Sequence, residues 1–358
     1  MTFSRLALAA AVCSSLLAPV PGAAATPAPY HHFSWQEVAP GVWFGLSLPG
    51  AFQSGNVAIV TLPGGGSMVV DTQNAGFIGQ EILEKAKAVG HGPVKYVVNT
   101  HLHQDHVGGN IAFVRDYPHV QIIAHRNACA GIVEKTEPRM VSRLPAMQKT
   151  LDDLRARRAA MPDGTVAEAE ARDFRMAGTA RYLAEAGDFQ WALPTQCLDL
   201  QPGEKKVITD GGRRIELLYF GPSHSNGDLV VFLPTEKVAM VGDLWGLNKV
   251  YDFLDAGLDG RDGSVLNVAS VLKQVRALDF TIALTGHSPI AYGKASLDDA
   301  IAGGANIIAP IRAAAERGDS AATILQQMPA PAGAIPFVAD VWRSIVTNVV
   351  DNVAQAKK

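Results

Sequence analysis

The chain is short of charged residues and has no concentration of charge of either sign. Asp, Glu, Lys and Arg make up 18% of its 358 residues, whereas roughly 25% is typical of globular proteins. The 31 basic residues are scattered among 34 acidic ones, and the formal net charge is −3. No basic block or aromatic stripe offers a footprint for nucleic acid, so we expect no nucleic-acid partner.

Cysteine is also scarce, because the chain has only three. None has the Cys-x-x-Cys spacing that is typical of redox motifs and zinc sites. Cys13 lies in the N-terminal segment, which leaves Cys129 and Cys197. These two could form a disulfide or remain two buried thiols, since sequence alone does not place their Cα atoms within bridging distance.

The first 25 residues have the features of a secretory signal. Arg5 supplies a positive start, Leu6 to Leu17 form an apolar stretch, and Ala23 to Ala25 provide small residues for cleavage. A retained anchor is the alternative, but the run is shorter than the ~20 residues that span a bilayer. No other segment approaches that length. We therefore expect a mature domain over 26–358, periplasmic or secreted, with no stable membrane insertion after cleavage.

Hydrophobic patterning predicts a layered α/β protein. Runs rich in β-branched residues and bounded by Gly or Pro predict strands over 41–44, 56–60, 67–71, 94–98, 120–124, 214–220, 229–233, 238–241 and 281–284. Helical spacing of apolar residues predicts helices over 79–89, 264–278 and 296–317. Strands that alternate with helices argue for a mixed α/β layered domain.

A segment from about 134 to 195 differs from the rest. It carries many Arg, Glu and Ala residues and little strand signal, and Leu144, Met147, Leu151 and Leu154 recur at helical spacing. We predict a helical insertion here.

Four potential metal ligands fall within six residues, directly after a predicted buried strand. They are His101, His103, Asp105 and His106. His101 and His103 leave an extended segment on the same side, whereas the adjacent Asp105 and His106 diverge and could serve a second metal. Imidazole and carboxylate suit zinc, iron or manganese. Crowding titratable groups without a cation to neutralise them is costly, so this cluster predicts a metal site.

The pattern His-x-His-x-Asp-His, followed by Gly108 and Gly109, resembles the signature of the metallo-β-lactamase superfamily. Later segments resemble its other ligand positions in the same order. They are His224 in Gly-Pro-Ser-His-Ser-Asn-Gly-Asp, Asp243 at the end of an apolar run, and His287 in Thr-Gly-His-Ser. This ordered match runs from about residue 40 to 290.

The resemblance implies a four-layer αβ/βα sandwich with the site at the loop edge between two sheets. It also implies two divalent metal ions, expected to be Zn²⁺. One ion would take His101, His103 and His224, and the other would take Asp105, His106 and His287. Asp243 would bridge both. Asp71, which follows a buried strand, would orient ligand histidines and not contact substrate; the alternative is that it is merely a polar strand end.

The same resemblance implies a hydrolytic mechanism. A water or hydroxide between the metals would be the nucleophile, because metal binding lowers its pKa toward ~7. Asp105 and Asp243 would be the catalytic carboxylates, and Asp105 would receive or relay the proton. We therefore expect an exported dinuclear hydrolase that cleaves an ester, lactone or amide of a small-molecule substrate. No oligomeric state is assigned.

Two alternatives belong to other classes of function. A true β-lactamase is the first, although Asp243 stands where one branch of those enzymes has a cysteine, and that branch lacks a histidine at the position of His106. The other dinuclear branch shares a histidine there but usually lacks a bridging carboxylate. The second alternative is an inactive, metal-stabilised binding protein. It is disfavoured because none of the expected metal-ligand positions is substituted.

The position of the insertion suggests a role near the site. It leaves the domain after the strand that follows the metal-binding loop and returns before the strands that lead to His224. We predict that it covers part of the metal cleft and shapes substrate choice, with flexible Met side chains suited to an adaptable pocket. Packing on the outer helical layer, away from the cleft, is the alternative.

Overall fold

The computed structural model describes most of the chain after its N-terminal segment. The described residues are 31–48, 55–160, 166–186, 189, 191–247, 263–330 and 336–357. The predicted export signal, residues 1–25, lies outside them. The chain from residue 31 onward forms one compact unit. Among the helices within these ranges, none is long and apolar enough to cross a membrane.

The first sheet contains seven strands within the described residues, arranged in sequence order. They are β1 (Phe33–Ala39), β2 (Val42–Ser47), β3 (Val57–Thr61), β4 (Ser67–Val70), β5 (Val94–Val98), β6 (Gln121–His125) and β7 (Gln196–Leu198). β1 to β4 form an antiparallel meander, and β4 to β7 are parallel. The carboxyl ends of the parallel strands therefore meet at one edge of the sheet.

The second sheet, as far as the chain is described, has six strands in the order β13-β12-β11-β10-β9-β8. They are β8 (Lys205–Asp210), β9 (Arg213–Tyr219), β10 (Leu229–Leu233), β11 (Val238–Gly242), β12 (Ile282–Thr285) and β13 (Ala291–Tyr292). β11 and β12 are parallel, and the other neighbours are antiparallel.

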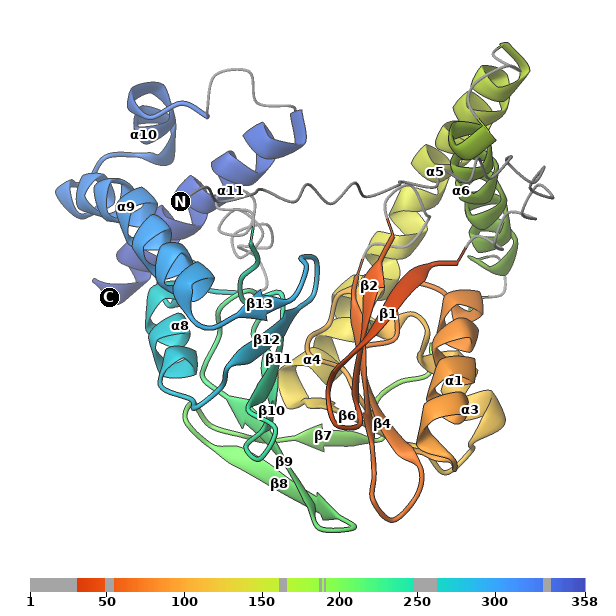
Figure 1. The fold of residues 1–358 in the computed structure, drawn as a ribbon. Coiled ribbons are helices and arrows are strands. Elements are labelled where there is room, and N and C mark those ends of the chain that lie inside the picture. Colours follow the sequence, from red (N-terminus) through yellow and green to blue (C-terminus); the bar gives the residue numbers. More distant parts are fainter. Residues whose placement is uncertain are drawn as a thin grey trace, which may run out of the picture. The chain divides into compact units, whose positions relative to one another are not determined.

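The helices flank both sheets. They are α1 (Gly76–Gly90), α2 (Gln104–Val107), α3 (Asn110–Asp116), α4 (Arg126–Gly131), the π-helix η1 (Ile132–Thr136), α5 (Glu137–Ala160), α6 (Val166–Ala186), α8 (Val268–Arg276), α9 (Ala295–Arg317), α10 (Ala321–Gln327) and α11 (Pro336–Ala356). α1 and α3 lie on the first sheet, and α8, α9 and α11 lie on the second (Figure 1).

Alternating side chains divide the core into layers, because successive residues of a strand point to opposite faces. On β10, Leu229 and Val231 face the other sheet, whereas Val230 and Phe232 pack beneath α8, α9 and α11. On β3, Ile59 similarly belongs to the cluster beneath α1. The result is helix, sheet, sheet and helix in four layers, which confirms the predicted αβ/βα sandwich.

Some boundaries differ from the sequence prediction for local reasons. The helix expected from residue 264 begins at Val268, because the backbone N–H of Ser264 donates to Ser223 O at 2.9 Å and the chain turns before it coils. The predicted helices end at Arg317, and the structure adds α10 and α11 beyond it. α11 buries Ile345 and Val349 in the core under the second sheet.

The segment predicted as a helical insertion contains α5 and α6, which pack against each other. Met140 is buried in the cluster beneath α1, and Leu144 and Met147 pack against the same cluster. These two side chains therefore help to attach the helices to the outer layer of the first sheet.

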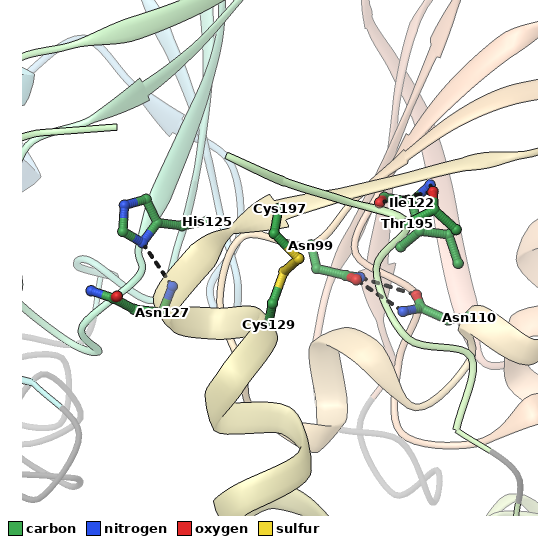
Figure 2. The surroundings of a disulfide bond; sticks show 8 residues. All are labelled: Asn99, Asn110, Ile122, His125, Asn127, Cys129, Thr195 and Cys197. Carbon is green, nitrogen blue, oxygen red and sulfur yellow. Dashed lines mark hydrogen bonds between the residues drawn. A yellow bond between two sulfur atoms is a disulfide. The ribbon is translucent and has the colours of Figure 1, made fainter. Parts of the chain in front are cut away.

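Cys129 and Cys197 form a disulfide at the base of this segment, so they are not two buried thiols. Their Cα atoms are 6.2 Å apart, and 68 positions separate them in the sequence. Figure 2 shows Cys129 on α4 and Cys197 on β7. The bond thus links the points where the chain leaves and rejoins the first sheet.

Candidate metal centre

The seven ligand-type residues predicted from the sequence meet at the loop edge between the two sheets. Each follows a strand or lies on the short helix α2. His101 and His103 follow β5, Asp105 and His106 lie on α2, His224 lies between β9 and β10, Asp243 follows β11, and His287 follows β12. Because parallel neighbours such as β11 and β12 end at the same edge, residues far apart in the sequence converge there.

Three imidazoles form the inner group. Nδ1 of His103 lies 2.9 Å from Nε2 of His101 and 3.0 Å from Nε2 of His224. Each imidazole nitrogen carries at most one proton, and hydrogen bonds alone do not explain three nitrogens that converge on one point. Such a triad of nitrogen donors suits a cation, and zinc in particular.

Asp105, His106 and His287 form the outer group. Nε2 of His287 lies 3.3 Å from Oδ2 of Asp105, and Nε2 of His106 lies 3.7 Å from the same oxygen. Their donor atoms all lie within 4.8 Å of one another, as do those of the inner group together with Asp243. Both groups could hold a metal ion.

Asp243 lies between the two groups. Its Oδ2 is 3.6 Å from Nε2 of His101, 3.4 Å from Nε2 of His106, 3.6 Å from Nε2 of His224 and 3.1 Å from Nε2 of His287. Its Oδ1 is buried and has no hydrogen-bond partner within the part of the chain that the structure describes. A buried carboxylate oxygen without a donor fits coordination of a cation.

The electrostatics of the cluster follow from its burial and its mixed charges. Burial and the neighbouring His106 lower the pKa of His101 well below its usual range, so this ring is neutral, as a ligand must be. Burial acts to raise the pKa of Asp105 and of Asp243, but His106 and the other nearby imidazoles outweigh it and hold both values well below their usual range. Burial acts to lower the pKa of His106, yet Asp243 and Asp71 outweigh it and raise that pKa well above its usual range. A divalent cation would displace such protons and balance the same carboxylates.

The sequence matches the family model of the metallo-beta-lactamase superfamily over residues 50–287, which is more than half of the chain. The chain belongs to this superfamily. Membership and the two donor groups support an enzyme of the metal-dependent hydrolase kind. A comparison with curated proteins gives no match.

Solved structures of the superfamily share the fold of this chain. A metallo-beta-lactamase from Pontibacter korlensis is 16% identical with a TM-score of 0.51, over 76% of this chain and 99% of that one. A metallo-beta-lactamase from Pseudomonas aeruginosa, in a mono-zinc form, is 15% identical with a TM-score of 0.53, over 78% and 97%. One from Erythrobacter litoralis is 17% identical with a TM-score of 0.50, over 77% and 98%. At these identities the likeness shows the fold.

Asp71 interacts with Nδ1 of His106 directly and with Nδ1 of His101 through Thr100. Its carboxylate accepts hydrogen bonds from the backbone N–H and the hydroxyl of Thr100, both at 2.8 Å, and lies 2.8 Å from Nδ1 of His106. An ionised carboxylate only accepts, so His106 must carry its proton on Nδ1. The Thr100 hydroxyl donates to Asp71 and can therefore accept from Nδ1 of His101, 3.1 Å away. Both rings then present Nε2 to the centre, which gives the predicted orienting role of Asp71 a geometric basis.

The backbone around Asp71 is unusual. Asp71 and Gln73 have φ values of 61° and 72°, in the left-handed region that side chains other than glycine rarely adopt. Gly109 packs against this turn so closely that an added Cβ would lie 1.9 Å from Thr72 O. The signature glycine at this position is therefore required for backbone packing behind the centre.

Several polar contacts that support the metal-binding loop were not predicted. The Thr136 hydroxyl donates to Leu102 O at 2.6 Å, and the side-chain amide of Gln104 donates to the Tyr182 hydroxyl. Thr136 and Tyr182 belong to the predicted insertion, so this segment touches the loop between its ligands. Thr100 could have been found as a polar residue at the end of a buried strand. Thr136 and Tyr182 carry no comparable signal in the sequence.

Proposed function

We propose that the protein is an exported, dinuclear metal-dependent hydrolase that cleaves an ester, lactone or amide of a small molecule. One observation carries this proposal: seven ligand-type side chains gather in two groups around the carboxylate of Asp243. The inner group and the outer group would each hold one ion, with Asp243 between them. The nitrogen-rich donor set favours Zn²⁺.

Bound metal ions in such a centre supply Lewis acidity, which activates water and polarises the scissile carbonyl. The two carboxylates of the centre, Asp243 and Asp105, differ in their exposure to solvent and therefore to substrate. The side chain of Asp243 is only 5% exposed, so it is positioned to hold ions. The side chain of Asp105 is 23% exposed, so it can be reached by water as well as by an ion. We therefore assign to the Asp105 carboxylate the task of accepting the proton from the attacking water.

Export is part of the proposal and has two supports. The N-terminal 25 residues have the charge, apolar stretch and small residues of a secretory signal. The Cys129–Cys197 disulfide includes an exposed cysteine on β7, and exposed disulfides persist in oxidising compartments. Expression with the native N-terminus in a Gram-negative host tests this. We expect a periplasmic protein that begins at Thr26, and a full-length cytoplasmic product would refute export.

The function is tested by metal analysis combined with a substrate panel. Purified protein reconstituted with zinc is expected to hold two ions per chain and to hydrolyse simple lactones or aryl esters. Nitrocefin belongs in the same panel, because the similar solved structures are named metallo-beta-lactamases. Turnover of nitrocefin alone would indicate a β-lactamase. Tight metal binding without turnover of any substrate would indicate a binding protein.

A further inference from the structure

Asn56 joins the two sheets next to the candidate metal centre. It immediately precedes β3, and only 3% of its surface is exposed. Its side-chain amide donates to Thr285 O at 2.9 Å and to Ser288 O at 2.8 Å, across sequence separations of 229 and 232. Its backbone N–H donates to Gly286 O at 2.6 Å, and its side-chain oxygen accepts from Ser47 N at 2.9 Å. A residue of the first sheet thus binds three carbonyls of one loop in the second sheet.

That loop, Thr285 to Ser288, carries His287. A second tether runs to the neighbouring strand, where Gly286 N donates to Gly242 O at 2.7 Å, directly before Asp243. The distance between the side chains of His287 and Asp243 therefore depends on the backbone of Gly286. This backbone is hydrogen-bonded to Gly242 through its N–H and to Asn56 through its carbonyl. If this loop moved, Nε2 of His287 would leave its position 3.1 Å from Asp243.

His287 needs this support more than His101 and His106 do. Its side chain is 32% exposed, whereas the side chains of His101 and His106 are 1% and 0% exposed. The two buried rings are also oriented by Thr100 and Asp71. An exposed ring has fewer packing neighbours to fix it, so the backbone of its loop decides where it points.

The chemistry of the contact requires an amide. The two N–H groups of one Asn side chain satisfy two carbonyls, and its oxygen accepts from a third residue. An aspartate has nearly the same shape, but it would place a carboxylate opposite two carbonyl oxygens. We infer that Asn56 is a positioning residue that sets the outer, His287-containing half of the metal centre. This inference rests on the proposed dinuclear function.

Arg213 provides a matched control at the other end of β3. Its guanidinium donates to Thr61 O at 2.8 Å and to Pro40 O at 2.7 Å, and it pairs with Glu236 at 3.1 Å. Arg213 belongs to the second sheet and binds backbone carbonyls of the first, so it too joins the two sheets. It differs from Asn56 in having no contact with any of the seven ligand-type residues or their loops among its described contacts.

The experiment titrates zinc into chelator-treated wild type, Asn56→Asp, Asn56→Ser and Arg213→Ala, with a competing indicator and with thermal unfolding in parallel. Wild type is expected to bind two ions. Asn56→Asp should keep the affinity of the first ion and weaken the second roughly 10–100-fold, as for other residues that orient ligands. Asn56→Ser retains one donor and should give an intermediate loss. Arg213→Ala should lower Tm and leave both zinc affinities within about twofold of wild type.

Two outcomes would overturn the inference alone. One is wild-type affinity for the second ion in both Asn56 variants. The other is an equal weakening in Arg213→Ala at a similar loss of Tm, which would mean that general stability governs the site. If Asn56→Asp does not fold, the comparison of Asn56→Ser with Arg213→Ala decides. A wild type that binds a single ion would refute the dinuclear function, and the inference would fall with it.

Discussion

The two halves of the candidate metal centre are built differently. In the inner half, His101 and His224 have side chains that are 1% and 2% exposed, and the ring of His101 is held from behind by Thr100. In the outer half, Asp105 and His287 are 23% and 32% exposed. Two of the three inner rings are fixed by burial, and in the outer half His106 is likewise buried and held by Asp71, whereas the position of the exposed His287 depends on a tether that crosses between the sheets.

This difference suggests that the two halves of the centre have different functions. A preorganised set of three imidazoles, two of them buried, favours tight metal binding, because little order is lost on ligation. The exposed carboxylate and imidazole of the outer half are accessible to substrate and to water. We expect the inner half to determine whether the centre forms, and the outer half to determine what it does.

The largest contrast should come from removing one ligand of each half. His101→Ala should abolish binding of both zinc ions, since the centre forms from the inner half, and should lower kcat/KM by more than ~100-fold, because residues that only orient ligands already cost roughly 10–100-fold. His287→Ala should retain one tightly bound zinc and lose the second. Elemental analysis and kinetics on both variants measure this. Equal zinc content in the two variants would remove the distinction between the halves.

A smaller effect should come from the contacts behind the rings. Asp71→Asn disturbs both His106 directly and His101 through Thr100, so both zinc affinities should fall, each by roughly 10–100-fold. Thr100→Val removes only the hydroxyl that His101 contacts, so the inner zinc alone should weaken. Competitive zinc titration separates the two constants. Unchanged affinity for the inner zinc in Asp71→Asn would show that Asp71 does not act through Thr100.

The loop of His224 should impose a pH dependence on the metal-free protein. Burial raises the pKa of Asp228 to about 7 against the opposing hydrogen bonds from Ser225. A raised carboxyl pKa in the folded state means that the folded state binds the proton more tightly than the unfolded state. Stability should therefore fall as the pH rises from about 4 to about 7 and then level off.

Asp228→Asn is the variant that tests this, because it keeps an acceptor for Ser225 and cannot ionise. Urea unfolding of chelator-treated protein across this pH range should show a smaller decline in the variant than in wild type. Parallel curves for the two proteins would mean that Asp228 does not titrate there.

The smallest expected effect concerns the contact between the insertion and the metal-binding loop. Tyr182→Phe removes the hydroxyl that Gln104 contacts, and should cost only about 1 kcal/mol of stability. If the insertion shapes substrate choice, the ratios of kcat/KM among lactone and ester substrates should change while zinc content stays constant. A uniform change that follows the loss of stability would favour simple packing on the outer layer.

The sequence was most informative where structure is local. His101 to His106 are only six residues long, so their pattern could be interpreted without knowledge of the fold. Strands such as β5 and β10 could also be predicted, since their β-branched residues are buried on both faces. The ligands Asp243 and His287 could be found because their order along the chain resembles that of the superfamily.

The rest depended on contacts between distant residues. Asn56 looks like an ordinary polar residue before a strand, and its partners lie 229 and 232 residues away. The link between Thr136 and Leu102 crosses 34 residues and depends on the π-helical turn η1. Propensity and spacing do not encode such pairings, because they arise only when separate elements pack together.

The disulfide at the base of the insertion has a mechanical consequence. β7 is a short edge strand, and its ladder with β6 includes only a few residues. Without the bond, a pull on α5 and α6 would be carried by that ladder together with the packing of these helices on the first sheet. The Cys129–Cys197 bond adds a covalent connection between α4 and β7 beside this ladder, with the two Cα atoms 6.2 Å apart. Under denaturing conditions, cleavage of the chain between α5 and α6 would accordingly leave two fragments that separate only after reduction.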